Sequence, residues 1–180
     1  MVGDLAEQDA GYSKKEGSVE VFNASDLSLP AKHPFGTTLK NINFDLKAGE
    51  ILGIAGVAGN GQDELMAIIS GEDDRNVKDG LSINGMSIGH LHAGERRKLG
   101  IANVPEERLG RGAVPDMSLT ENTLLTHSDG FIKNGLVQWQ SIKEYTTELI
   151  SKYKVKCHGE FSEAKSLSGG NLQKFIMGRE

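Results

Sequence analysis

Glycines cluster between residues 56 and 61, where the chain reads Gly-Val-Ala-Gly-Asn-Gly. An apolar run at 51–55 precedes this cluster, and apolar residues follow it at helical spacing over 65–69. A strand, a glycine loop and a helix in this order form a turn whose backbone N–H groups can bind phosphate. The cluster is therefore a candidate phosphate-binding loop.

The side chains of this loop depart from the phosphate-loop pattern G-x-x-x-x-G-K-[ST]. With the fixed glycines at Gly56 and Gly61, Gln62 takes the lysine position and Asp63 the hydroxyl position. Losing the lysine's charge contact with phosphate costs roughly 4 kcal/mol at an effective dielectric near 20. The alternative is an ordinary strand-to-helix turn whose glycines allow close packing. As a degenerate phosphate loop, its binding residues would be Gly56, Gly59, Asn60, Gly61, Gln62 and Asp63.

A second motif, Leu-Ser-Gly-Gly-Asn-Leu-Gln-Lys, occupies residues 167–174. Ser168 can cap the helix that follows and offer its hydroxyl to a phosphate oxygen. Gly169 and Gly170 leave the start of that helix open to an anion, which the helix dipole favours. A plain N-cap with a glycine turn explains Ser168 but not the rest of the motif.

Other elements must position these two motifs. The pair Asn84-Gly85 predicts a two-residue hairpin turn, because both turn positions need positive φ. The run at 51–55 is apolar on both faces, which predicts a buried strand of parallel type. Further strands are expected at 18–21, 42–46, 81–83, 86–88 and 101–104, and helices after the glycine loop and at about 118–126 and 138–154.

The second motif strongly resembles the signature of ATP-binding cassette (ABC) ATPases, in the form found in their carbohydrate- and nucleoside-uptake branch. The resemblance covers about residues 18–180. Residues 56–62 and 105–108 resemble the second, degenerate domain of tandem ABC proteins. The implied fold is α/β, an ABC-type P-loop nucleotide-binding core with an antiparallel β subdomain and a helical insertion at about 105–165, C-terminally incomplete. Residues 1–17 are expected to be a linker or tail.

The resemblance also implies roles for particular residues. In the family, the signature contacts the γ-phosphate of ATP bound to the opposite domain. The family's glutamine that senses metal and couples to the permease falls near 106, where Glu106 or Glu107 stands instead. Phe35, with His33 next, is the candidate for stacking on adenine, and a surface-loop aromatic is the alternative. The signature residues assigned to the trans ATP contact are Leu167, Ser168, Gly169, Gly170, Asn171 and Gln173.

The family follows its signature helix with a strand ending in Asp-Glu and then a switch histidine. The two carboxylates of Asp-Glu hold Mg²⁺ and polarise the attacking water. The sequence ends at Glu180, so we expect a fragment that does not hydrolyse ATP by itself and lacks a strand beside 51–55. ATP and Mg²⁺ are expected mainly at the site shared with a partner domain. No metal site of its own is expected, since His90 and His92 have no third ligand nearby.

These expectations lead to a hypothesis about transport. The chain would be the ATP-binding part of an ABC importer for nucleosides or sugars, on the cytoplasmic, inner face of the cell membrane. Its partners would be another ABC nucleotide-binding domain, membrane permease subunits and, indirectly, a substrate-binding lipoprotein. The alternatives are a binding or assembly module that uses no nucleotide, and a truncated piece without function. Arg108 and Arg111 are either surface charges or part of a groove facing the permease.

Composition restricts the possible partners. The chain has 20 basic and 25 acidic side chains, a formal net charge of −5, which argues against nonspecific nucleic-acid binding. Its single cysteine excludes an internal disulfide and fits a reducing compartment. No apolar run reaches the roughly 18–20 residues of a membrane-spanning helix.

Overall fold

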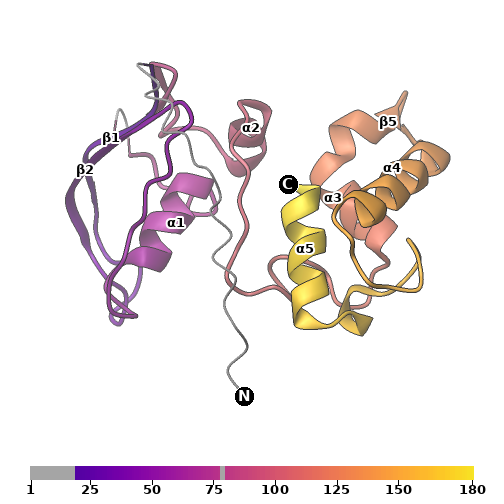
Figure 1. Cartoon of the computed structure of the whole chain (residues 1–180). Coiled ribbons are helices and arrows are strands. Elements are labelled where there is room, and N and C mark those ends of the chain that lie inside the picture. Colours follow the sequence, from indigo (N-terminus) through magenta and orange to yellow (C-terminus); the bar gives the residue numbers. More distant parts are fainter. Residues whose placement is uncertain (1–18, 78–79) are drawn as a thin grey trace. The chain divides into compact units, whose positions relative to one another are not determined.

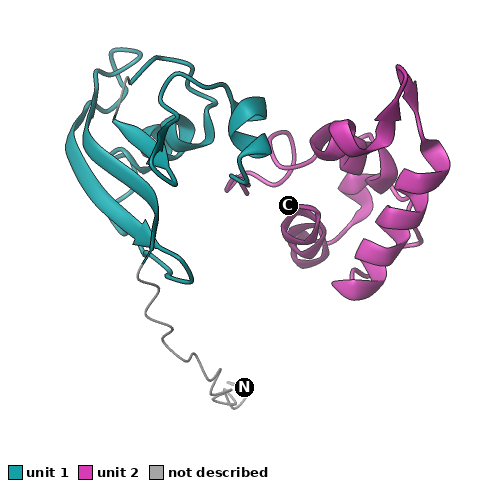
Figure 2. Cartoon of the chain, turned by 90° about the horizontal axis from the view of Figure 1, so that it is seen from above, with its two compact units in different colours: residues 1–101 teal, residues 102–180 magenta. Residues whose placement is uncertain are grey.

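The computed structural model describes residues 19–77 and 80–180. The predicted tail at 1–17 lies outside the described residues. The chain divides into two compact units, Met1–Ile101 and Ala102–Glu180, each treated by itself below (Figures 1 and 2). Among the described residues, no helix is long and apolar enough to cross a membrane.

The first unit contains an antiparallel four-stranded sheet in the order β2-β1-β3-β4. Asn84 and Gly85 form the turn of the β3–β4 hairpin with φ values of 49° and 77°, as their residue types predict. The strands expected at 42–46, 81–83 and 86–88 are confirmed, and the strand expected at 18–21 is confirmed from residue 20 on, since residue 18 lies outside the described residues. Their bounds are β1 Glu20–Leu29, β2 Leu39–Lys47, β3 Leu81–Ile83 and β4 Met86–Ser87.

Two helices complete the first unit, α1 Gln62–Ser70 and α2 Ala93–Lys98. The helix α1 was expected after the glycine loop, and it places Ile68 in a buried cluster with Leu27 and Leu81 of the sheet. Burial of these apolar side chains provides most of the driving force that holds helix and sheet together.

The apolar run at 51–55 does not form the predicted buried strand. No regular structure is found over 51–57, and the side chains of Ile51, Ile54 and Val57 are 75%, 54% and 76% exposed. A buried strand of parallel type needs neighbouring strands to pair with its backbone groups. None of the strands in the described residues pairs with this run. The strand expected at 101–104 is wrong for the same reason.

The second unit is mainly helical. Its helices α3 Leu119–Phe131 and α4 Trp139–Lys152 confirm the two predicted helices, and α5 Gly169–Arg179 carries the second motif. Leu119, Leu149, Phe175 and Ile176 bring the three helices into one buried apolar cluster. The smaller elements are the hairpin β5 Ile132–Lys133 and β6 Leu136–Val137, which was not predicted, and the 3₁₀ turn η1 Ala164–Ser166.

Candidate functional site

The glycine loop of the first unit is fixed to the residues just before β2. The hydroxyl of Thr37 donates to the carbonyl of Gly59 at 2.9 Å. Gly61 caps α1 with φ of 104°, and a methyl group in place of its hydrogen would lie 3.0 Å from Leu39 Cδ2. Glycine therefore serves both the backbone angle and the close contact at this position.

The side chain of Gln62 folds back over the loop. Its Nε2 donates to the carbonyl of Val57 at 3.1 Å, and a methyl group on Gly56 would lie 2.6 Å from that nitrogen. Its Oε1 is buried and has no hydrogen-bond partner in the described part of the chain. The neutral amide thus closes the loop on itself at the position where a phosphate loop has its lysine.

Carboxylates already occupy the start of α1. Asp63 and Glu64 lie in the first helical turn, and Glu64 Oε1 accepts from the backbone N–H of Thr37 at 2.9 Å. Hydrogen bonds from the N–H groups of Thr37 and Glu64 itself hold the pKa of Glu64 below its usual value, with a smaller contribution from the charge of His33. Two anions at a helix N-terminus compete with a phosphate for the same favourable potential. The residues of this loop therefore do not fit tightly bound Mg-ATP.

The residues proposed for adenine lie in the loop between β1 and β2. Phe35 is fully exposed and His33 is exposed. The N–H of Gly36 donates to the carbonyl of His33 at 2.9 Å and closes this loop. Stacking by Phe35 stays a prediction, as does its surface-aromatic alternative.

The signature-like motif begins α5 in the second unit. Ser168 has extended N-cap angles, φ −63° and ψ 152°, but its hydroxyl does not cap the helix as predicted. Instead, Ser168 Oγ accepts from Asn171 Nδ2 at 2.9 Å, and Asn171 Oδ1 accepts from the N–H of Lys156 at 3.0 Å. Because Ser168 Oγ accepts the bond from Asn171, the hydroxyl hydrogen of Ser168 remains available to donate to another group.

The first turn of α5 contains no acidic residue. Gly169 and Gly170 are exposed, and a methyl group on Gly170 would meet nothing within 4 Å. The first N–H groups of a helix have no partner inside the helix, so those of this turn are available to an acceptor from outside. Leu167 packs against the apolar cluster, while Gln173 is exposed one turn along the helix. The arrangement fits an oxyanion such as a phosphate at this end of α5.

A loop packs along the same helix. It contains the exposed candidates Glu106 and Glu107, and its turn is closed where Gly112 N donates to Glu107 O at 3.0 Å. The buried Arg179 near the end of α5 donates from Nη2 to Gly112 O at 2.9 Å and from Nη1 to Asn122 O at 3.3 Å. Sequence reasoning missed Arg179, because a cation in the last turn of a helix is also typical of a solvent-facing position.

Asn122 is a second residue that sequence reasoning missed. It is fully buried in α3, where its Oδ1 accepts from the N–H of Val114 at 2.7 Å. Its Nδ2 donates to the carbonyls of Met117 and Ser118, at 3.1 and 3.0 Å. No signal in the sequence marks this asparagine as buried. Asn122 therefore fixes the part of the loop that leads directly into α3.

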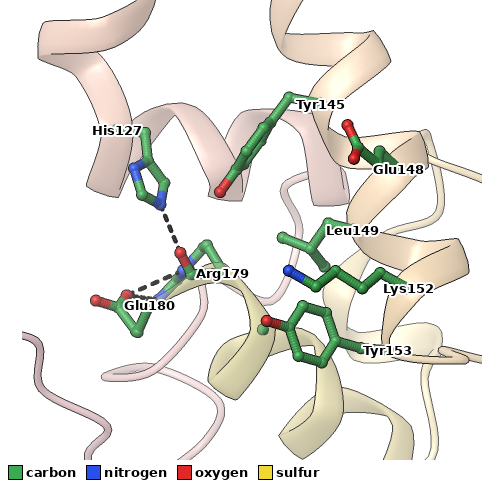
Figure 3. Close-up of a pocket in the computed structure, with 9 residues that line it drawn as sticks. His127, Tyr145, Glu148, Leu149, Lys152, Tyr153, Arg179 and Glu180 are labelled. Carbon is green, nitrogen blue, oxygen red and sulfur yellow. Dashed lines mark hydrogen bonds and ion pairs between the residues drawn. The ribbon is translucent and has the colours of Figure 1, made fainter.

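A hollow of about 270 Å³ opens among α3, α4 and α5 (Figure 3). Figure 3 shows His127 and Tyr145 on one side and Tyr153 on another, with His127 Nε2 lying 2.5 Å from the carbonyl oxygen of Arg179. This hollow was not predicted. No group of three or more potential metal ligands is found among the described residues.

Comparisons with known proteins place these features in a family context. The sequence pattern of the ABC transporter family matches residues 39–179. The chain is 38% identical over 141 residues to the uncharacterized ABC transporter ATP-binding protein YphE of Escherichia coli, covering 78% of this chain and 28% of that protein. It is 36% identical over 146 residues to the guanosine import ATP-binding protein NupO of Bacillus subtilis (79% and 28%), and 34% identical over 171 residues to the ribose import ATP-binding protein RbsA of Lactococcus lactis (93% and 33%).

A solved structure agrees on the fold. An ATP-binding cassette of an ABC transporter superposes with a TM-score of 0.66 at 18% identity, covering 90% of this chain and 64% of the other. The chain spans 28% to 33% of the length of the curated relatives named above. The glycine loop lies in the first unit and the signature-like motif in the second.

Proposed function

Because this chain belongs to the ABC transporter family of ATP-binding proteins, we propose that it is the second, degenerate nucleotide-binding domain of a tandem ATPase that drives import of nucleosides or sugars. In this proposal its signature motif completes an ATP site on a partner domain. Its own glycine loop forms at most a weak, non-hydrolytic site.

The contrast between two helix N-termini carries the proposal. The helix after the glycine loop, α1, starts with Asp63 and Glu64, and the amide of Gln62 closes the loop. The signature helix, α5, starts with no acidic residue and with Ser168 unused as a cap. A negatively charged phosphate is favoured at the second N-terminus and opposed at the first.

Each signature residue has a separate role in this proposal. Ser168 donates its hydroxyl hydrogen to an oxygen of the terminal phosphate, and Asn171 fixes the position of that hydroxyl. Gly170 leaves room for the phosphate to approach the backbone N–H groups, and Gly169 brings no side chain into that space. Leu167 anchors the motif to the apolar cluster, and Gln173 extends the exposed surface toward the partner domain.

The remaining candidates support the same assembly. Phe35, with His33 beside it, offers a surface to the adenine of a nucleotide held weakly at the glycine loop. Glu106 and Glu107 occupy the place of the coupling glutamine, on the loop that packs along α5. ATP-driven closure of the two domains would reach membrane permease subunits through the helical unit, on the cytoplasmic face of the membrane. Mg²⁺ enters with the ATP held mainly by the partner domain.

The solute class follows from the relatives. The relatives include ATP-binding proteins for the import of guanosine, nucleosides, ribose and galactose. We therefore place the solute of the assembly among nucleosides and sugars. A substrate-binding lipoprotein would deliver that solute without touching this chain.

The signature role is tested by Ser168→Arg in the complete protein that contains this chain. Arginine at 168 fills the space at the start of α5 and removes the hydroxyl, so ATP turnover should fall about a hundredfold or more. Ser151→Arg introduces the same side chain at an exposed position of α4 and should leave turnover unchanged. Normal turnover with Ser168→Arg would reject the trans role.

The degenerate loop is tested by restoring its missing groups. The double substitution Gln62→Lys and Asp63→Ser should raise the affinity of the chain for Mg-ATP at least about tenfold in calorimetry, because it supplies a cation and removes an anion. No gain in affinity would show that this turn is not a phosphate loop. If neither ATP binding nor ATP-dependent pairing with the partner domain is found, the assembly-module alternative is correct.

A further inference from the structure

Arg108 lies against the first residue of the signature helix. A methyl group on Gly169 would stand 2.7 Å from Arg108 Nη1, so the guanidinium covers the α-carbon of that glycine. In sequence, Arg108 belongs to the loop before α3 and stands far from the motif at 167–174. The fold alone brings this cation to the end of α5 where a phosphate would bind.

The loop holds the backbone of Arg108 in place at several points. Ala113 N donates to Arg108 O at 2.7 Å and closes the turn. A methyl group on Gly112 would lie 2.9 Å from Ile176 Cδ1, which shows that the turn lies directly on α5. Arg179 adds its hydrogen bond to Gly112 O at 2.9 Å. The guanidinium of Arg108 therefore extends from a base that is fixed relative to the signature motif.

The electrostatics of this position are unfavourable without an anion. A helix N-terminus carries partial positive charge, so a cation placed beside it is repelled. Among the described residues, the guanidinium of Arg108 has no hydrogen-bond or ion-pair partner, and the first turn of α5 offers no carboxylate. The carboxylate of its neighbour Glu107 is turned to Gly110, where a methyl group would lie 3.3 Å from Oε1. An anion between Arg108 and the helix would turn this repulsion into attraction at both contacts.

We propose that Arg108 is a specificity-determining residue of the signature surface, contacting the terminal phosphate of the nucleotide and so distinguishing a nucleoside triphosphate from a diphosphate. This inference rests on the proposed function, in which Ser168 reaches the nucleotide of a partner domain. The planar guanidinium can give two parallel N–H···O bonds to one phosphate, a geometry that arginine provides and lysine does not. Ser168, the N–H groups at Gly169 and Gly170, and Arg108 would then surround one phosphate from three directions.

The test is binding of Mg-AMP-PNP and Mg-ADP to the complete protein with its partner domain, measured by calorimetry. With Arg108→Gln, we expect AMP-PNP to bind about 10- to 100-fold more weakly and ADP to bind within about twofold of the wild type. Arg108→Lys should give an intermediate loss, because it keeps the charge without the paired donors. Lys133→Gln removes the same charge from the exposed β5–β6 hairpin and should change neither affinity.

Two results would overturn the assignment of Arg108: unchanged affinity for both nucleotides, or equal weakening of both. Ser168→Arg separates this inference from the proposed function. If Ser168→Arg weakens AMP-PNP binding and Arg108→Gln does not, only the role of Arg108 fails. If Ser168→Arg has no effect, the proposed function fails as well. Arg108 is exposed, so the thermal unfolding of its variants should match the wild type and confirm that each is folded.

Discussion

Arg179 Nη2 donates a 2.9 Å hydrogen bond to the carbonyl oxygen of Gly112, joining residues that are 67 positions apart in the chain. The same guanidinium pairs with Glu180 Oε1 at 2.9 Å, with both side chains buried. This contact fixes the loop that carries Glu106, Glu107 and Arg108 to the helix that begins with the signature motif. A substitution that displaces the loop should therefore also displace α5, and the reverse.

Replacing Arg179 should loosen that loop. In Arg179→Ala, the carbonyl of Gly112 and the carboxylate of Glu180 lose a buried partner, so the free energy of unfolding should fall by about 3 kcal/mol. Hydrogen exchange at the N–H of Ala113, which closes the turn, should accelerate. Lys174→Ala, at an exposed position of the same helix, serves as the control. Unchanged exchange at Ala113 would contradict the fixed attachment.

Arg96 should be essential for the stability of the first unit. It is 1% exposed and donates from Nε to Leu91 O at 2.9 Å and from Nη1 to Ile69 O at 3.0 Å and to Ile68 O. Burial lowers the pKa of Arg96, so these carbonyls are what make a buried charge tolerable.

The substitution Arg96→Met keeps a similar volume but leaves those carbonyls without a donor. Urea unfolding should show a loss of about 3 kcal/mol. Lys40→Gln removes an exposed cation of β2 and should change the free energy of unfolding by less than about 0.5 kcal/mol. A loss for Arg96→Met no larger than that control would show that the buried hydrogen bonds contribute nothing.

Whether Gly178→Ala stabilises or destabilises the protein should depend on the ring of Tyr153. Alanine inside a helix is normally more stable than glycine by about 1 kcal/mol. Here the new methyl group would stand 2.7 Å from Cγ of Tyr153 and overlap its Cδ2. Overpacking of this kind costs about 1–3 kcal/mol, so the net effect should be destabilising. In a Tyr153→Ala background the ring is gone, and Gly178→Ala should become stabilising; thermal unfolding of the four variants measures both effects.

Acid should weaken the ion pair between Asp73 and Arg75. Arg75 Nη2 lies 2.7 Å from Asp73 Oδ2, and the side chain of Asp73 is 8% exposed. Hydrogen bonds from the Arg75 side chain lower the pKa of Asp73, although burial opposes them. Because the folded pKa is the lower one, the stabilisation is complete above about pH 4 and is lost as the pH falls through the folded pKa.

Asp73→Asn should remove the pH dependence of stability that comes from the Asp73 carboxylate. We expect a loss of about 1–3 kcal/mol at pH 7 and a smaller difference from the wild type below about pH 3. Urea unfolding at several pH values provides the measurement, and Asp45→Asn on an exposed position of β2 is the matched control. An equal deficit at both ends of the pH range would mean that the carboxylate charge is not responsible.

Local rules were enough for much of the architecture. Asn84-Gly85 predicted its hairpin because asparagine and glycine both tolerate the positive φ that the two turn positions need. The helix α1 followed from the spacing of apolar residues after the glycine loop, and α3 and α4 were expected at about 118–126 and 138–154. The run at 51–55 failed as a strand because a strand depends on neighbours, and its own residues do not supply them.

The spacing of residues along the chain could not reveal the hydrogen-bond partners of polar side chains. Arg96 lies in the last turn of a short helix, where a cation is usual, yet its acceptors Ile68 and Ile69 stand 28 and 27 residues earlier in the chain. The hydroxyl of Ser168 was expected to cap its own helix, but its oxygen accepts a hydrogen bond from the side chain of Asn171 instead. Each of these contacts depends on which groups meet in space, and the order of residues says little about that.

The amino-acid sequence by itself determined which functional groups are present: a glycine loop with glutamine in place of lysine, and a serine with two glycines at a helix start. Residue type fixes charge, hydrogen-bonding capacity and allowed backbone angles wherever the chain goes. Only the tertiary structure decided how those groups are used. It turned Gln62 inward over its loop and set Arg108 against Gly169, because the partner of a polar group is chosen by distance and competition among neighbours.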